Sequence, residues 1–517
     1  DSNHFNLTLF NSCKKSTNYS SGNTTVFDNS KTTQGTIYGQ VVNEDGTPLA
    51  DANVRVGANS YTTDKDGIFY FSKITTQQNA TLVTVTKNNY FTGYRTLRIQ
   101  TNKDHYAKIM MIEMKNAATF NSITGGTVNV NGGGTITFPA NGIAYKSNGT
   151  PYNGTVTMYS KWLDPTSNTL NQMMPGDLRA IDANNAEKIL QTFGMMGVEL
   201  FDNSGTALQI ASGKTAKMSF PIPSSISVNA PNSIPLWSFD SVTGMWKEEG
   251  SATKQGSNYV GDVKHFSFWN CDVPNNFIQL DMTLTDNFGV PLANNSVKIT
   301  NPATGSFSYG YTNSAGFVSG YVPDNAILTL EVLAPLPCTN VIHSQTVTTT
   351  SANLSLGTIA IVVPAANNYT FTGTVLDCSG NPVTSGFVSI SANSSSIMVP
   401  TNSLGVFNAS MILCASTATA SVTAYDLTAN VNDNVSVTIN SGANNLGNLN
   451  ACSNLNAFIN WSSTVGAVTN SFSVTEPTDV LTSQYSPTSG TFIYGYSSGA
   501  VNVGFNFDGL DNTTGSH

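Results

Sequence analysis

Charged side chains are scarce in this chain. Only 10% of its 517 residues are Asp, Glu, Lys or Arg, and the net charge of −9 comes with no stripe of basic residues. Proteins that bind nucleic acid place Lys and Arg along the phosphate backbone, so no nucleic-acid partner is predicted. No apolar run approaches the roughly 18 residues of a membrane-spanning helix. We therefore expect contact with a membrane only through a lipid anchor.

Histidine and cysteine are also scarce. The five histidines lie far apart, and the six cysteines form neither a CxxC pair nor another metal-ligand spacing. We therefore predict no metal site and no cofactor. Cys378, Cys414 and Cys452 fall in one candidate domain. One disulfide among these three is expected in an oxidising compartment, and its pairing stays open.

What the chain does contain is short alternating apolar and polar segments between turns. Hydrophobic residues reach 39% and aromatic residues 10%, enough to build packed cores and to exclude a disordered chain. Alternation over a few residues, bounded by Gly, Pro, Asn and Asp, is typical of β-strands. A chain of 517 residues is too long to fold around one hydrophobic core, so several domains are expected. The predicted fold class is all-β, with tandem antiparallel β-sandwiches of transthyretin- or immunoglobulin-like type.

One sequence pattern occurs three times. An alternating segment leads to a turn with an acidic or amide residue, then Gly, then Pro, and a second alternating segment follows. Each copy then carries a second polar turn that closes on Gly before an apolar segment, which predicts a hairpin. The paired turns are Asp45–Pro48 with Asp64–Gly67, Asp286–Pro291 with Asn313–Gly316, and Asp377–Pro382 with Asn402–Gly405.

The turn at Asp64-Lys65-Asp66-Gly67 also resembles the start of a calcium loop. The remaining ligands of a twelve-residue calcium site are missing from the sequence that follows. We therefore predict that these residues close a hairpin.

The three repeats resemble a known domain family. Residues 34–114 resemble the carboxypeptidase-regulatory-like domain, a transthyretin-like sandwich of seven strands, on the strength of both turns. Residues 275–364 and 365–453 are similar to more divergent members. The resemblance implies rigid, non-catalytic spacers or docking surfaces. Serial sandwiches of this kind predict a rod or an arch with no obvious place for a pocket large enough for small-molecule catalysis.

Residues 115–274 follow a different pattern. The motifs that define it are Gly132–Ala140, which ends in Phe-Pro-Ala, the turn between Trp237 and Trp246, and His265–Trp269. This set resembles a ZU5-like β-sandwich, and it is similar to a module of cartilage intermediate layer proteins and of many Bacteroidota surface proteins. The resemblance implies a larger β-rich central module. Residues 454–514 carry further short strand patterns, which predict a small C-terminal β domain.

His265-Phe266-Ser267 is the one motif with possible chemistry. It matches the cleavage site of self-cleaving ZU5 domains, where Ser267 would attack the preceding carbonyl and His265 would act as base. The structural alternative is a strand that buries its aromatic residues and turns His265 and Ser267 toward solvent. No other catalytic residues are predicted, and the chain is not expected to be a conventional enzyme.

The N-terminal residues 1–33 read as a flexible leader and tether. Leu7-Thr8-Leu9-Phe10-Asn11-Ser12-Cys13 resembles the end of a bacterial lipoprotein signal, which implies lipid attachment at Cys13. The alternative is a polar leader with an incidental cysteine. With an anchor, the protein would lie on the extracellular face of an outer membrane of Bacteroidota type; without one, it would be secreted.

Three functions fit these features. The leading hypothesis is an accessory or scaffold subunit of a large outer-membrane complex for nutrient uptake, secretion or protein assembly, with outer-membrane barrel proteins and other surface lipoproteins as partners. The second is a glycan-binding or adhesive surface protein whose aromatic residues stack on sugars, with Trp162, Trp246 and Trp461 as candidates. The third is a module that cleaves itself at His265-Phe266-Ser267.

Overall fold

The computed structural model describes residues 27–334, 340–393, 395–415 and 417–454, and beyond them the backbone of five strands. In these parts the helices are short: α1 (Leu170–Met173), η1 (Ser227–Asn229) and η2 (Ala365–Asn367). Nearly all other regular structure is β-strand, so the predicted all-β class is confirmed. No helix among the described residues has the length and apolar character to cross a membrane. Cys13 lies outside the described residues.

The first sandwich packs a three-stranded sheet against a four-stranded sheet. In the smaller sheet β1 lies between β4, which is antiparallel to it, and β7, which is parallel. The larger sheet has the order β3-β2-β5-β6. Inward residues such as Ile37, Phe69 and Val85 form the core between the sheets. The strands are β1 (Thr32–Val42), β2 (Asn53–Val56), β3 (Asn59–Thr62), β4 (Ile68–Gln77), β5 (Thr81–Thr86), β6 (Gly93–Leu97) and β7 (Asp104–Met110).

The second sandwich repeats this topology. One sheet has the order β24-β21-β27 and the other β23-β22-β25-β26. Its first strand again pairs antiparallel with the fourth and parallel with the seventh. The strands are β21 (Phe277–Asp286), β22 (Ser296–Asn301), β23 (Ser306–Tyr311), β24 (Phe317–Pro323), β25 (Ile327–Leu333), β26 (Val341–Thr348) and β27 (Leu354–Ile361).

The third sandwich has the same plan with one added strand. Its sheets have the orders β31-β28-β34 and β30-β29-β32-β33-β35. The strands are β28 (Asn368–Leu376), β29 (Gly386–Ala392), β30 (Ser395–Pro400), β31 (Val406–Ile412), β32 (Thr417–Asp426), β33 (Val431–Asn440), β34 (Gly442–Asn450) and β35 (Ser453–Asn454).

The central module is one sheet of 13 strands that wraps around its own core. Trp237, Trp246 and Trp269 are all fully buried in it. The strands are β8 (Ala118–Asn121), β9 (Gly126–Asn129), β10 (Thr135–Phe138), β11 (Ile143–Tyr145), β12 (Thr155–Leu163), β13 (Arg179–Ile181), β14 (Glu187–Phe201), β15 (Ala207–Ile210), β16 (Ala216–Pro221), β17 (Ser233–Asp240), β18 (Met245–Gln255), β19 (Asn258–Val263) and β20 (Phe268–Asn275).

Five further strands follow the third sandwich. β36 pairs with β37, and β39 lies between β38 and β40. Their bounds are β36 (Ala457–Val465), β37 (Val468–Glu476), β38 (Leu481–Ser486), β39 (Thr491–Tyr496) and β40 (Asn502–Phe505).

The second turn of each repeat is built by a side-chain cap. Asp64 Oδ1 accepts hydrogen bonds from the N–H groups two and four residues later, both at 3.0 Å. Asn313 and Asn402 do the same in the other two repeats. The turn then needs glycine: Gly67 has a φ of 69°, and a Cβ there would lie 2.3 Å from the carbonyl oxygen of Val41. The predicted turn at Asp64 is confirmed, but the predicted hairpin is wrong, because the turn joins β3 to β4, which lie in different sheets.

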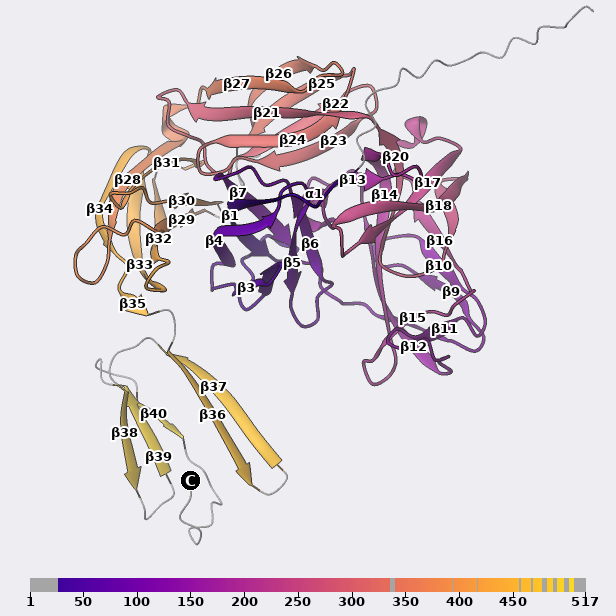
Figure 1. Cartoon of the computed structure of the whole chain (residues 1–517), viewed down its shortest axis with the longest axis horizontal. Coiled ribbons are helices and arrows are strands. Elements are labelled where there is room, and N and C mark those ends of the chain that lie inside the picture. Colours follow the sequence, from indigo (N-terminus) through magenta and orange to yellow (C-terminus); the bar gives the residue numbers. More distant parts are fainter. Residues whose placement is uncertain are drawn as a thin grey trace, which may run out of the picture.

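The sandwiches do not follow one another in a straight row. In Figure 1 the first sandwich (indigo) lies in the middle, with the central module (magenta) on one side, the third sandwich (orange) on the other and the second sandwich across the top. Of the two expected shapes, the described domains form an arch that closes on the first sandwich.

Contacts between the first and third sandwiches close this arch. The rings of Tyr70 and Phe387 stack with centroids 4.4 Å apart, and Tyr425 stacks on the other face of Phe387 at 4.2 Å. Tyr425 also donates its hydroxyl hydrogen to Asp64 Oδ2 at 2.6 Å. Asp64 and Tyr425, which are 361 positions apart in sequence, are thus in direct contact beside the buried cluster that contains Tyr70, Phe387 and Tyr425.

The cysteines of the third sandwich are not joined to one another. Cys414 is disulfide-bonded, whereas Cys378 and Cys452 are free thiols. The expected disulfide within this set of three is therefore wrong for the structure. Cys378 Sγ lies 3.5 Å from the carbonyl oxygen of Cys452, and burial together with this thiol raises the pKa of Cys452 to about 11.

Candidate functional site

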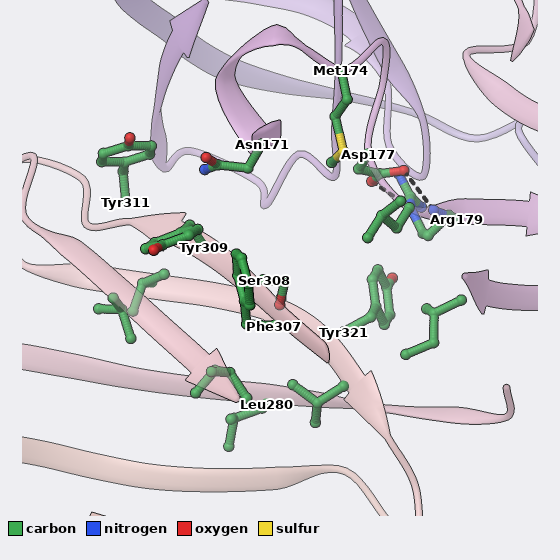
Figure 2. A pocket seen from close by; sticks show the side chains of 18 of the residues that line it. Asn171, Met174, Asp177, Arg179, Leu280, Phe307, Ser308, Tyr309, Tyr311 and Tyr321 are labelled. Atoms are coloured by element: carbon green, nitrogen blue, oxygen red, sulfur yellow. Dashed lines mark hydrogen bonds and ion pairs between the residues drawn. The ribbon is translucent and has the colours of Figure 1, made fainter. Parts of the chain in front are cut away.

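A cavity of about 360 Å³ opens where the first sandwich, the central module and the second sandwich meet. Pockets for small molecules span about 300–1,000 Å³, so this one lies at the small end of that range. Figure 2 shows the α1 loop with Asn171 and Met174 above, Phe307 and Tyr309 of β23 in the middle, and Leu280 of β21 below. The expectation that the chain has no obvious place for a pocket of small-molecule size is wrong, because it considered the sandwiches one at a time.

The floor of the cavity reaches into the second sandwich. Side chains alternate along a strand, so Val318, Gly320 and Val322 of β24 face the same side. Both valines are buried, and Gly320 pairs with the buried Leu280 of β21. A Cβ added at Gly320 would nevertheless meet no atom within 4 Å. Gly320 itself is exposed, so the inner face of the second sandwich is open at this glycine and is not closed by a side chain.

Aromatic side chains line the cavity on the opposite face of β23 and β24, where they alternate with the inward Ser308, Gly310 and Gly320. Phe307, Tyr309 and Tyr311 come from β23, and Tyr321 comes from β24. The Tyr311 ring meets Tyr106 of the first sandwich edge-on at 5.8 Å. Contacts of this kind hold the walls contributed by different domains against one another.

Arg179 is the most buried charge at the cavity. Only 1% of its side chain is exposed, and its Nε donates to Asp177 Oδ2 at 2.8 Å. Its Nη1 donates to the carbonyl oxygen of Asn79 at 2.9 Å, and the guanidinium lies 5.3 Å from the centre of the Tyr321 ring. Arg179 thus joins all three domains. Its Nη2 has no hydrogen-bond partner among the described residues, and neither has Oδ1 of the buried Asn171.

Two more cations at the cavity lack a carboxylate. Arg95 donates only to the backbone carbonyl oxygens of Asn171 and Gly176. No ion pair to Arg95 or Lys108 is formed among the described residues. Burial lowers the pKa of both side chains.

The cavity lining is therefore electropositive in a chain whose net charge is −9. Four cationic side chains line it, Arg95, Arg98, Lys108 and Arg179, against the carboxylates of Asp104 and Asp177. Asp104 is already bound to the turn of the second sandwich, where it accepts hydrogen bonds from the backbone N–H and hydroxyl of Ser314. Arg179 is compensated by Asp177 and Glu187, so an anion entering the cavity would meet unpaired positive charge at Arg95 and Lys108.

These cavity residues are absent from the predicted site residues. They come from three domains, so no local motif contains them. One signal was present: aligning the three repeats on their turns places Gly320 where the third repeat has Ala409. A glycine at an inward strand position marks a weakened core or a place that another group approaches.

The self-cleavage motif lies in a bend that leads into β20, not in the strand predicted as its structural alternative. Phe266 and Phe268 are buried as expected. His265 Nε2 lies 3.0 Å from Glu249 Oε2, and Ser267 donates its hydroxyl hydrogen to the carbonyl oxygen of Phe268 at 3.1 Å. In this arrangement both predicted catalytic groups bind other partners.

The side chain of Gln209 binds both backbone polar groups of Phe266, the residue that precedes the bond that would be cleaved. Gln209 Nε2 donates to the carbonyl oxygen of Phe266 at 3.0 Å, and Gln209 Oε1 accepts from the Phe266 N–H at 2.7 Å. A donor on the carbonyl oxygen would stabilise the negative charge that develops there if Ser267 attacked.

The three candidate tryptophans have different surroundings. Trp246 is fully buried and donates its Nε1 hydrogen to the carbonyl oxygen of Asp177 at 2.8 Å, so its prediction as a sugar-stacking ring is wrong. Trp162 is half-buried against the central core. Trp461 lies in β36, where side chains are not described. Within the described residues, no cluster of three or more His, Cys, Asp or Glu side chains could hold a metal ion.

Comparison with known proteins relates parts of the chain to a family model and to two named proteins. Residues 36–260 match the family model described as FAM171A1/A2/B, N-terminal. This match covers less than half of the chain. Cartilage intermediate layer protein 2 of Homo sapiens is 28% identical over 158 residues, which cover 27% of this chain and 13% of that protein. Cartilage intermediate layer protein 1 of Sus scrofa is 31% identical over 109 residues, 20% of this chain and 17% of that protein.

The predicted similarity to cartilage intermediate layer proteins is thereby confirmed, although the chain matches less than a fifth of their length. Among solved structures, the shaft pilin SpaA of Lactobacillus rhamnosus GG is 11% identical with a TM-score of 0.17, covering 34% of this chain and 98% of the pilin. The Bacillus anthracis TIE protein is 11% identical with a TM-score of 0.16, covering 76% of this chain and 72% of that one. TM-scores this low do not support an inference about function from either structure.

Proposed function

We propose that this protein is a non-enzymatic extracellular scaffold or adhesive protein. The observation that supports this best is the closed arch, in which Tyr70, Phe387 and Tyr425 lock the first sandwich to the third. Four domains held against one another present fixed surfaces, as a scaffold or adhesive requires. The relatives named for a layer of cartilage are consistent with an extracellular location.

The finer form of this proposal is an accessory subunit of an outer-membrane complex, anchored through Cys13. It is tested by affinity purification of the tagged full chain from native membranes in mild detergent, followed by mass spectrometry. Excess untagged protein serves as the competition control. Stoichiometric recovery of barrel proteins or other surface lipoproteins is expected, and a solitary protein would contradict the subunit role.

The lipid anchor has its own test. Replacing Cys13→Ser removes the only atom to which the lipid could be attached in the predicted motif. If the anchor exists, the variant moves from the membrane fraction to the soluble fraction, while Cys378→Ser, at a free thiol of the third sandwich, does not. Equal membrane recovery of both variants would exclude lipidation at Cys13.

Glycan binding is the alternative if no protein partner is found. With Trp246 buried, the predicted stacking residues reduce to Trp162 and Trp461. A glycan array identifies a ligand, and Trp461→Ala should then weaken binding of that ligand at least tenfold, because a stacked ring supplies contact area. Unchanged binding in both tryptophan variants would exclude this role.

Self-cleavage is a second candidate because Gln209 donates to the carbonyl oxygen of Phe266. The test is the intact mass of freshly folded protein, with Ser267→Ala as the inactive control. Two fragments that meet between Phe266 and Ser267 would support cleavage. One uncleaved mass for the wild-type chain, after long incubation, would exclude it.

A further inference from the structure

We propose that the cavity between the three domains binds an amphipathic carboxylate, with an apolar chain on the floor at Gly320 and the acid group among the cations of the rim. Such a ligand goes beyond the scaffold role, and neither proposal depends on the other.

The floor of the cavity, at Gly320, favours binding of an apolar group. The space at Gly320 is bounded by aliphatic side chains that are each at most 8% exposed: Leu280, Met282, Val318, Val322 and Leu328. Water can reach this space at the exposed Gly320, but these side chains offer it no hydrogen-bond partner. Hydrocarbon placed there leaves water and fills the void in the sandwich core.

The rim of the cavity, which carries Arg95, Lys108 and Arg179, favours binding of an acid group. Arg95 and Lys108 have no carboxylate partner among the described residues. Arg179 is paired with Asp177 and Glu187, and its Nη2 is still free to donate a hydrogen bond. A carboxylate accepts hydrogen bonds from an arginine in paired geometry, and it would supply the counter-charge that Arg95 and Lys108 lack. Asn171 Oδ1, which also has no partner, would accept from a water or hydroxyl that accompanies the acid group.

The same features disfavour a saccharide. A sugar carries hydroxyl groups around its ring, and burying them against Leu280 and Val322 would remove their hydrogen bonds to water without replacing them. Only a molecule with its polarity at one end matches a site whose floor is aliphatic and whose rim is cationic.

The first test is calorimetric titration of the full chain with hexanoate, decanoate and tetradecanoate. Each methylene buried should lower the dissociation constant roughly fourfold until the floor is filled. Decanol, with the same chain and no charge, should bind at least tenfold more weakly than decanoate. Absence of binding by all three acids would overturn the proposal, as would binding of an oligoglucuronate in their place, which would indicate a glycan site.

Two variants locate the binding in this cavity. Gly320→Leu places a side chain in the empty space, so decanoate binding should be lost while the melting temperature stays equal or rises. Lys108→Met removes one rim charge at similar volume and should weaken decanoate at least threefold. Lys217→Met, at an exposed lysine of β16, is the matched control. Wild-type affinity in both Gly320→Leu and Lys108→Met would overturn the assignment.

Discussion

The second and third sandwiches have the same strand pairing and the same turns, yet one has a packed core and the other a cavity. Counted from the turn residues Asn313 and Asn402, the inward side chains of β31 are larger than those of β24: Phe407, Ala409 and Met411 against Val318, Gly320 and Val322. The three in β31 are at most 2% exposed.

The neighbouring edge strands show the same difference. On β30, Ile397 and Val399 face the core opposite Ile390 and Val388. At the corresponding places on β23 the residues are Ser308 and Gly310, opposite Ile299 and Val297. Turn chemistry and pairing therefore set the topology, whereas the volume of a few inward side chains decides whether the core is filled.

The largest expected difference comes from truncating the packed core. Phe407→Ala should destabilise the third sandwich by about 3–5 kcal/mol, because a large buried ring leaves a cavity that cannot collapse. Val318→Ala, at the matching place beside an existing space, should cost about 1 kcal/mol. Hydrogen exchange of β31 and β24 amides measures each sandwich separately, and equal losses would contradict the packing difference.

The first turns of the two repeats offer a second comparison. Asp286 is fully buried, and its Oδ2 accepts from Asn368 Nδ2 at 3.1 Å across the interface with the third sandwich. Asp286→Ala should lower the free energy of unfolding by about 1–3 kcal/mol, because it leaves buried hydrogen-bond donors unpaired. Asp377→Ala, in the equivalent exposed turn, should cost far less. Urea unfolding of both variants checks this. A larger loss of unfolding free energy in Asp377→Ala than in Asp286→Ala would contradict the larger contribution of the buried turn.

Substitutions that add side-chain volume should change the stability of the second and third sandwiches in opposite directions. Gly320→Leu should stabilise the second sandwich by about 1 kcal/mol, since it fills space and leaves no strained contact. Ala409→Leu should destabilise the third by about 1–3 kcal/mol through overpacking. Both are read from thermal melts with hydrogen exchange to locate the change. Destabilisation by both would mean that the space at Gly320 is not available to a side chain.

The smallest expected effect is the pH dependence of one exposed turn. Hydrogen bonds from the backbone and side chain of Asn381 lower the pKa of Asp377. A carboxyl whose pKa is lower in the folded state adds stability above its unfolded pKa and loses it as the pH falls through the folded value. Asp377→Asn should therefore be slightly less stable than wild type at neutral pH and equal to it in strong acid. Urea unfolding at both pH values tests this.

Much of the fold followed from the sequence. The alternation of apolar residues and the positions of Asp64, Gly67 and their repeats predicted short antiparallel strands, because these residues act on neighbours only a few positions away. The burial of Phe266 and Phe268 followed from the same alternation. Trp246 was misjudged because its alternation shows only which strand face it occupies, and another segment of the chain covers that face.

The sequence by itself determined the strands, their turns and the all-β class, since each depends on local backbone preferences and a period of two residues. Only the tertiary structure decided how the sandwiches close into an arch, that Arg95 meets backbone carbonyl oxygens in place of a carboxylate, and that the space at Gly320 opens to the junction. Those features arise from side chains that are distant in sequence and are brought together by packing between domains, and no local pattern records which partners will meet.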